Sequence, residues 1–196
     1  MNSIKFNQQG IEAILNGIKT MTRRPVKHNL ECYRSRGQQA IRIEPENDPW
    51  YKDRNYCIRD NIGAWMDLTK EEFLNLTCKY KVGETVFIEN VDGTCILCDE
   101  EWGNCDCQDK QPEITFSNIK VERLHDISEE DCLKEGVEAP KECYIPYTCN
   151  AYEGYYIGEA EKHTFKAEIW NNLPYKASYD WKSNPYVFVY EFEVLY

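Results

Sequence analysis

The C-terminal end constrains this chain most, because large apolar side chains occupy every second position there. Asn184-Pro185 leads into an alternation of Tyr186, Phe188, Tyr190, Phe192 and Val194. A period of two is typical of a β-strand with one buried face. A strand that is aromatic along one whole face belongs in a core, so the sequence predicts a β-rich body.

Two further strands are expected upstream. The turn-forming run Lys81-Val82-Gly83-Glu84 precedes a β-branched and aromatic segment at residues 85–89. A second segment at residues 114–124 alternates apolar and polar side chains, with a predicted bulge near Ser117-Asn118.

Helices are expected where capping residues flank apolar periodicity. The predicted helices cover residues 8–16 (N-cap Asn7, stop Gly17), 68–76 (capping box Thr69 and Glu72), 128–136 (N-cap Ser128, stop Gly136) and about 159–171. Strands mixed with short helices indicate an α+β fold.

The chain length favours one compact domain with insertions over two independent domains. We expect a single domain over residues 1–196, with insertions at about 28–77 and 92–112. The first insertion contains signals for a short hairpin, and residues 138–158, rich in tyrosine and proline, are expected to be a loop or flap.

No long apolar run and no signal-peptide pattern are present, so we expect a cytoplasmic protein without membrane association.

Charge is unevenly distributed along the chain. The 23 basic and 34 acidic residues give a net charge of −11, which argues against broad capture of nucleic-acid backbone. Residues 19–36 nevertheless hold six cations against Glu31, whereas residues 84–113 hold nine acids against Lys110. One cationic groove could therefore receive an anionic or nucleotide-like ligand.

The cationic segment Gly17-Ile18-Lys19-Thr20-Met21-Thr22-Arg23-Arg24-Pro25 follows the first predicted helix. If it is extended, Thr22 and Arg24 share one face and Arg23 lies on the other. If it stays turn-like, Lys19 can fold back toward the Thr22 hydroxyl. Glu135 is placed at the end of the third predicted helix, where a carboxylate faces the negative end of the helix dipole.

Ten cysteines and no secretion signal favour thiols with a metal site over a disulfide framework. Cys95-Ile96-Leu97-Cys98 and Cys105-Asp106-Cys107 lie close enough to form a small knuckle. Four thiolates from Cys95, Cys98, Cys105 and Cys107 would close a tetrahedral, structural Zn²⁺ site. Reduced thiols without metal remain the alternative.

Several patterns, in order, resemble the ASCH family of proteins with a PUA-like β-barrel. They are the first helix with Gly17-x-Lys19-Thr20-x-Thr22-x-Arg24, the Tyr80 to Val86 turn and strand, Val121 to Val137, and Pro185 to Val194. Thr22-Arg23-Arg24-Pro25, Ile127-Ser128-Glu129-Glu130-Asp131 and Trp181-x-x-Asn184-Pro185 are most similar to the longer members carried by phages and prophages. The resemblance covers about half of the chain and implies an α+β fold with a PUA-like barrel, flanking helices and inserted loops.

The resemblance also implies a catalytic set. In a bacterial member that hydrolyses N(4)-acetylcytidine, a lysine, a threonine three residues later and a glutamate in a following helix match Lys19, Thr22 and Glu135. Thr22 would attack, Lys19 would activate it and Glu135 would carry a proton. Arg23 and Arg24 are the expected ligand-binding residues, with Arg24 suited to a carbonyl oxygen or a phosphate.

Three functions stay open at this point. The first is an amidohydrolase that removes an acyl group from a modified cytidine, with a nucleoside, a nucleotide or single-stranded RNA as ligand. The second is a non-catalytic module that binds RNA or a modified base in the same pocket. The third is a phage accessory protein that uses its zinc knuckle and acidic face to bind a host protein, in which case changes at Lys19, Thr22 and Glu135 would leave binding of that protein intact.

Overall fold

The computed structural model describes residues 2–27, 40–46, 48–60, 62–98, 107, 112–137, 145–149, 152–156, 165–173 and 179–195. Its strands are β1 (Ser3–Phe6), β2 (Met21–Pro25), β3 (Ile41–Ile43), β4 (Tyr56–Arg59), β5 (Trp65–Leu68), β6 (Thr85–Asn90), β7 (Glu113–Arg123), β8 (Ile145–Cys149), β9 (Tyr152–Tyr156) and β10 (Tyr186–Leu195). Its α-helices are α1 (Gln8–Leu15), α3 (Lys70–Thr77) and α4 (Glu129–Lys134). The expected α+β class is confirmed.

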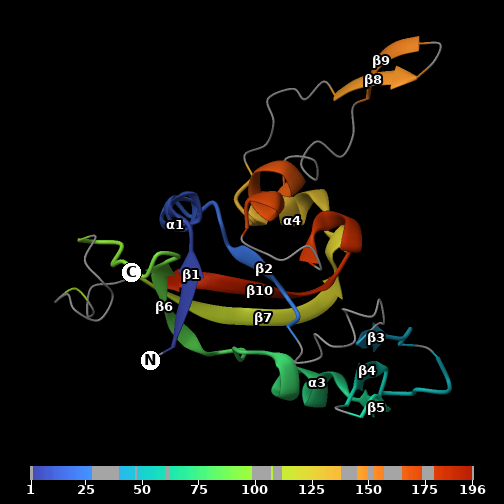
Figure 1. Cartoon of the computed structure of the whole chain (residues 1–196). Helices are drawn as coiled ribbons and strands as arrows, with labels where there is room; N and C mark the ends of the chain where they lie inside the picture. Colours follow the sequence, from blue (N-terminus) through green and yellow to red (C-terminus); the bar gives the residue numbers. More distant parts are fainter. Residues whose placement is uncertain are drawn as a thin grey trace.

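A five-stranded sheet in the order β1-β6-β7-β10-β2 forms the body of the protein (Figure 1). The long antiparallel pair of β7 and β10 lies at its centre. The pairing shifts register after Glu191, which lies opposite Asn118, to Phe192, which lies opposite Phe116. Ser117 is thus the extra residue, and the bulge predicted near Ser117-Asn118 is confirmed.

Side chains of β10 alternate between two cores, one on each face of the sheet. Phe188, Tyr190 and Phe192 belong to the larger core, and Tyr186 and Val194 pack against it, as the alternation predicts. Val187 and Val189 point the other way, into a second core. We call the face that bears Phe188 and Tyr190 the inner face and the opposite one the outer face.

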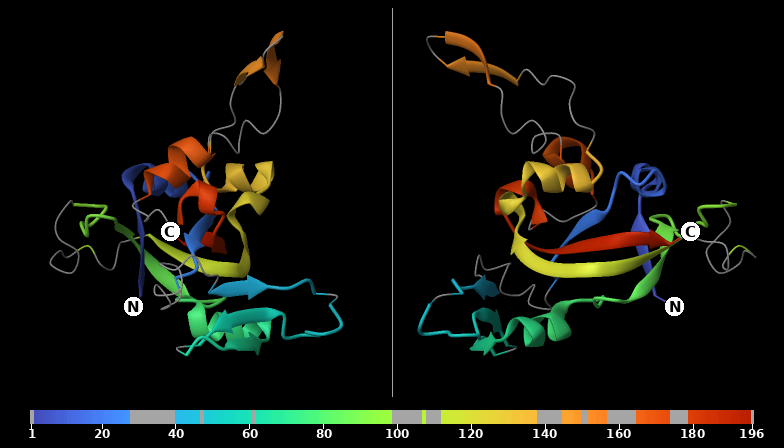
Figure 2. Two further views of the ribbon diagram at one scale, coloured as in Figure 1. Left: turned by 45° about the vertical axis from the view of Figure 1, so that its right-hand side comes forward. Right: turned by 180° about the vertical axis from the view of Figure 1, so that it is seen from behind.

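Different layers cover the two faces. The three-stranded sheet β3-β4-β5 and α3 lie on one side of the main sheet, and α4 with the helical turns at residues 165–172 lies on the other (Figure 2). Ile41, Ile58 and Phe73 join the inner core, whereas Leu124, Cys132 and Trp170 join the outer one. The insertion at 28–77 therefore contributes three strands and a helix to the core, more than the short hairpin and helix predicted.

The main sheet does not close by backbone pairing within the described part of the chain. β1 and β2 form its two edges, although only α1 and its short connections separate them in sequence. A side chain spans the gap instead, because Arg24 Nη2 on β2 donates to the Lys5 carbonyl on β1 over 2.7 Å. We call this gap between the β1 and β2 edges the seam.

The helix ends follow the sequence signals. Asn7 caps α1 by accepting from the Gly10 amide, Thr69 and Glu72 form the capping box of α3, and Ser128 accepts from the Asp131 amide at the start of α4. Gly17 (φ +70°) and Gly136 (φ +92°) follow the ends of α1 and α4 in left-handed conformations.

Two expectations need correction. Residues 138–158 were expected to be a loop, but β8 and β9 form an antiparallel hairpin within them. The helix expected over about 159–171 is, in its described part, a π-helical turn at Phe165–Ile169 followed by a 3-10 turn at Trp170–Asn172. Phe165 and Trp170 are buried there. No helix among the described residues is long and apolar enough to cross a membrane.

The two helix-ending glycines give a matched stability prediction. Gly136→Ala is expected to cost about 2 kcal/mol or more of unfolding free energy, and Gly17→Ala about 1 kcal/mol. Both require an unfavourable positive φ, but a Cβ at Gly136 would lie 3.3 Å from Ala13 Cβ and 3.4 Å from Lys19 Cβ, whereas nothing lies within 4 Å at Gly17. Urea unfolding of both variants measures the difference, and equal losses would refute the packing contribution at Lys19.

Candidate functional site

The cationic segment is extended, so its side chains separate onto two faces of β2. Thr22 pairs with Tyr190 and Arg24 with Phe188, which places both on the inner face. Arg23 pairs with Val189 and lies on the outer face, toward α4. The extended alternative, with Thr22 and Arg24 on one face and Arg23 on the other, is confirmed.

Lys19 and Glu135 form a buried ion pair where β2 approaches α4. Lys19 Nζ lies 2.7 Å from Glu135 Oε2 and also donates to the Glu135 carbonyl over 2.6 Å. Lys19 is 5% exposed and Glu135 3%. The ammonium thus binds both the carboxylate and the C-terminal carbonyl of α4, a favourable place for a cation.

Burial shifts the acid–base behaviour of Lys19. Desolvation lowers the pKa of Lys19 below its ordinary value of 10.5, and the charges of Arg24 and Arg23 act in the same direction. Glu135 opposes the shift through its charge and hydrogen bond without cancelling it. A lysine in this setting gives up its proton more readily than a surface lysine does.

Arg23 holds the other side of Glu135. Its Nη1 donates to Glu135 Oε1 over 3.2 Å and to Met21 Sδ, and Nε and Nη2 make three further bonds to Glu122 and Asp131. These five bonds match the five N–H groups of a guanidinium. Arg23 was predicted to bind ligand, but its geometry favours positioning Glu135.

Thr22 lies close to this network in a buried position, at 2% exposure. Within the described part of the chain, its hydroxyl makes no hydrogen bond to Lys19 or Glu135. It does line the same pocket as both residues. The three predicted catalytic residues therefore meet in one pocket, but no hydrogen bond connects the hydroxyl to the ion pair.

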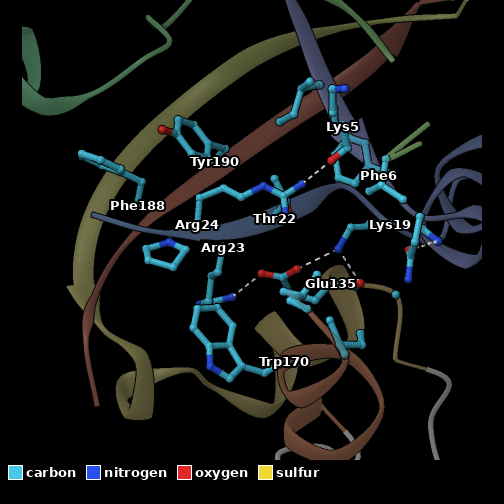
Figure 3. Close-up of a pocket in the computed structure, with 18 of the residues that line it drawn as sticks. Lys5, Phe6, Lys19, Thr22, Arg23, Arg24, Glu135, Trp170, Phe188 and Tyr190 are labelled. Atoms are coloured by element: carbon cyan, nitrogen blue, oxygen red, sulfur yellow. Dashed lines mark hydrogen bonds and ion pairs between the residues drawn. The ribbon is translucent and has the colours of Figure 1, made fainter. Parts of the chain in front are cut away.

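The pocket has a volume of about 540 Å³ and lies along the seam. Figure 3 shows Lys19 and Glu135 pointing toward each other, while Arg24 extends toward Lys5 and Phe6. Among the described residues, the lining includes six cations and one carboxylate, namely Lys5, Lys19, Arg23, Arg24, Lys27, Lys79 and Glu135. It also includes six aromatic rings, namely Phe6, Tyr80, Phe165, Trp170, Phe188 and Tyr190.

Arg24 crosses the seam on the inner face. Besides the bond to Lys5, its guanidinium lies 5.1 Å from the centroid of the Phe6 ring. A cation over an aromatic face is attracted by the ring, and this contact fixes the side chain beside the pocket. Arg24 was predicted to bind ligand; it lines the pocket, and its binding of a ligand stays a prediction.

The aromatic lining and Lys79 were not identified from the sequence as parts of this site. Tyr80 and Tyr190 lie far from the cationic segment in sequence. Pairing of β10 with β2 places Tyr190 beside Thr22, and the Tyr80 ring packs against Tyr190 with a centroid distance of 5.6 Å. The alternation along β10 could have indicated part of this lining. Phe188 and Tyr190 lie on one face of β10, so they must lie beside the side chains of a strand that pairs with it, as β2 does.

The cysteine cluster is described in part. The Sγ atoms of Cys95, Cys98 and Cys107 lie within 4.8 Å of one another, close enough to hold one metal ion. The Leu97 amide donates to Cys95 Sγ over 3.4 Å. The predicted fourth ligand, Cys105, lies outside the described residues.

Comparisons of this chain with models of protein families, with curated proteins and with solved structures gave no match.

The lowered pKa of Lys19 gives a prediction about pH and stability. Between the pKa of Lys19 in the folded chain and 10.5, Lys19 holds its proton in the unfolded chain more often than in the folded chain. Raising the pH through this range therefore lowers the free-energy cost of burying Lys19. The unfolding free energy of the wild type relative to Lys19→Met should therefore increase from about pH 7 to about pH 10. Chemical denaturation of both proteins across this range measures the difference. A flat or falling difference would contradict the prediction, and the comparison removes contributions shared by both chains.

Proposed function

We propose that the seam pocket binds a cytosine-type nucleoside or nucleotide and hydrolyses an acyl group from its exocyclic amine. The observation that carries the proposal is the buried Lys19–Glu135 pair, 2.7 Å apart, lining the same pocket as Thr22. Aromatic rings around the pocket suit a planar base, and the cations suit an electron-rich ligand.

In the proposed reaction Thr22 is the nucleophile, Lys19 is the base and Glu135 carries a proton to the leaving amine. The Thr22 hydroxyl attacks the acyl carbonyl carbon while the neutral form of Lys19 accepts its proton. The bond from the acyl carbon to the base nitrogen breaks, and the leaving amine takes a proton from Glu135. Because Lys19 and Glu135 are in contact, the proton that Lys19 accepts from Thr22 can pass to Glu135 and from there to the leaving amine. Water then hydrolyses the acyl-threonine ester and restores the hydroxyl.

We further propose that the five-stranded sheet is a PUA-like barrel opened at the seam. Its support is the position of β1 and β2 at opposite edges of the sheet, with Arg24 bridging them. The order of motifs that resembles the ASCH family supports the same proposal. The seam would then be the mouth through which a ligand enters the barrel interior.

A non-catalytic binding module is the second candidate. It is favoured by the Thr22 hydroxyl, which makes no hydrogen bond to Lys19 or Glu135 among the residues described. In this function the same lining would hold RNA or a modified base without bond cleavage.

Hydrolysis of N-acylated cytosine nucleosides and nucleotides, followed by chromatography, tests the enzymatic proposal. The wild type should release the acyl group, and Lys19→Ala, Thr22→Ala and Glu135→Ala should each lower kcat/KM by about 100-fold or more. Thr20→Ala is the matched control, because Thr20 lies two residues from Thr22 and outside the pocket lining. Turnover that survives Thr22→Ala would exclude Thr22 as nucleophile. No turnover, with ligand binding retained on folded protein, would favour the binding module.

We also propose that Cys95, Cys98 and Cys107 hold structural Zn²⁺, with Cys105 as the fourth ligand. The clustering of three thiols within 4.8 Å supports this, and four thiolates would leave no open position for water. Elemental analysis of the purified protein should give about one zinc per chain, falling in Cys95→Ser and Cys98→Ser. Cys57→Ser, which changes a buried thiol in the three-stranded sheet, should retain the metal. Equal zinc content in all of these variants would refute the site.

A further inference from the structure

The cations that line the seam pocket differ in how their charges are compensated. Lys19 and Arg23 face Glu135, Glu122 and Asp131, and Lys5 pairs with Glu89 over 3.1 Å. By contrast, Arg24, Lys27 and Lys79 form no ion pair with any carboxylate in the described ranges. Positive charge therefore remains uncompensated along one part of the lining.

Two of these cations are fixed on the same edge of β1. The Asn2 and Phe6 carbonyls accept from Phe87 and Val91, so alternate carbonyls of β1 point toward β6. The intervening carbonyls of Ser3 and Lys5 point to the seam, where Lys79 Nζ donates to Ser3 over 3.3 Å and Arg24 Nη2 to Lys5 over 2.7 Å. Carbonyls two residues apart on a strand are separated by about 7 Å. One tetrahedral anion can bridge cations at such a spacing with a charge-assisted hydrogen bond at each side.

Aromatic rings hold both cations in place without neutralising them. Arg24 lies over Phe6 at 5.1 Å, and Lys79 Nζ lies 4.8 Å from the centroid of Tyr80. The Tyr80 hydroxyl also donates to the Ser3 carbonyl over 2.7 Å. Arg24 donates one N–H to the Lys5 carbonyl, and its guanidinium has further N–H groups that can donate to a second acceptor. Neutral carbonyls and rings thus position the two charges, and an anion would complete their coordination.

We infer that Arg24 and Lys79 form a phosphate subsite at the seam, so that the ligand of this pocket is a phosphorylated nucleoside, free or within RNA. The inference rests on the proposed function for the base-binding part of the pocket. Phosphate would bind to Arg24 and Lys79, while the base reaches the aromatic rings and the Lys19–Glu135 pair. Arg24 offers the planar fork that suits two phosphate oxygens, and Lys79 supplies a point charge.

Calorimetric titration of the full chain with matched ligands tests the subsite. The ligands are cytidine, cytidine 5′-monophosphate, ribose 5-phosphate and a short oligocytidylate without terminal phosphates. The wild type should bind the monophosphate about tenfold more tightly than cytidine, as one added charge-assisted contact implies. Arg24→Gln should reduce this ratio to about one and Lys79→Gln should reduce it in part, because each variant loses one contact to the phosphate.

Matched variants separate the subsite from general attraction. Lys81→Gln removes the same charge two residues from Lys79, on an exposed side chain outside the lining, and should leave the ratio intact. Arg24→Lys retains the charge and should recover part of the preference, which also covers the case in which Arg24→Gln folds poorly. An equal loss in Lys81→Gln and Lys79→Gln would overturn the subsite.

The remaining outcomes distinguish this inference from the proposed function. Equal affinity for cytidine and its monophosphate overturns the subsite and leaves nucleoside binding standing. Binding of ribose 5-phosphate that is lost in Arg24→Gln, without cytidine binding, supports the subsite and refutes base recognition. Binding of the oligocytidylate alone, also lost in Arg24→Gln, assigns the phosphate to RNA. Absence of binding by all four ligands overturns both proposals.

Discussion

A carboxylate at the C-terminal end of a helix is unfavourable, since it faces the carbonyl end of the helix dipole. Glu135 nevertheless lies there, 3% exposed, because Lys19, in the segment before β2, and Arg23, on β2, approach its two oxygens. Breaking a buried pair by removing one partner costs several kcal/mol, since the other charge is left without compensation. The position of α4 against β2 therefore depends on this three-residue network, and so does the wall of the pocket that Glu135 forms.

The same strand determines what the pocket can present to a ligand. β2 is an edge strand, so both of its faces border the seam and no further strand of the described part of the chain lies between them and the pocket. The N–H groups of Arg23 on the outer face are all used, four by carboxylates and one by the Met21 sulfur. Arg24, the next residue, instead reaches across the seam to a backbone carbonyl. Adjacent arginines thus have opposite roles, one holding the acid in place and the other remaining able to bind an anion.

The sequence predicted the local elements better than their assembly. Capping residues such as Asn7 and Ser128, and the alternation in β10, act over a few positions, and each gave the observed element. The extended choice for Thr22 to Arg24 also placed these side chains on the correct faces. Saturation of Arg23 could not be predicted, because Glu122 and Asp131 come from distant elements that only the sheet order brings together. The core role of β3-β4-β5 was missed for the same reason, since its buried face is short and its partners are remote.

The charges on and near β2 affect both the pKa of Lys19 and the kind of ligand that the seam attracts. Burial is the main cause of the lowered pKa of Lys19, and the nearby charge of Arg24 adds a smaller shift in the same direction. An anion bound to Arg24 would offset this effect, so binding at the seam and protonation of Lys19 are coupled by linkage. The net charge of −11 acts against long polyanions over distances of about one Debye length, roughly 8 Å at physiological ionic strength. A single phosphate in the seam would meet Arg24 and Lys79 within that distance, whereas an extended nucleic acid would also meet the net negative charge of the rest of the chain. These charges therefore favour the proposed small phosphorylated ligand, or one nucleotide of a short strand, over a long polyanion.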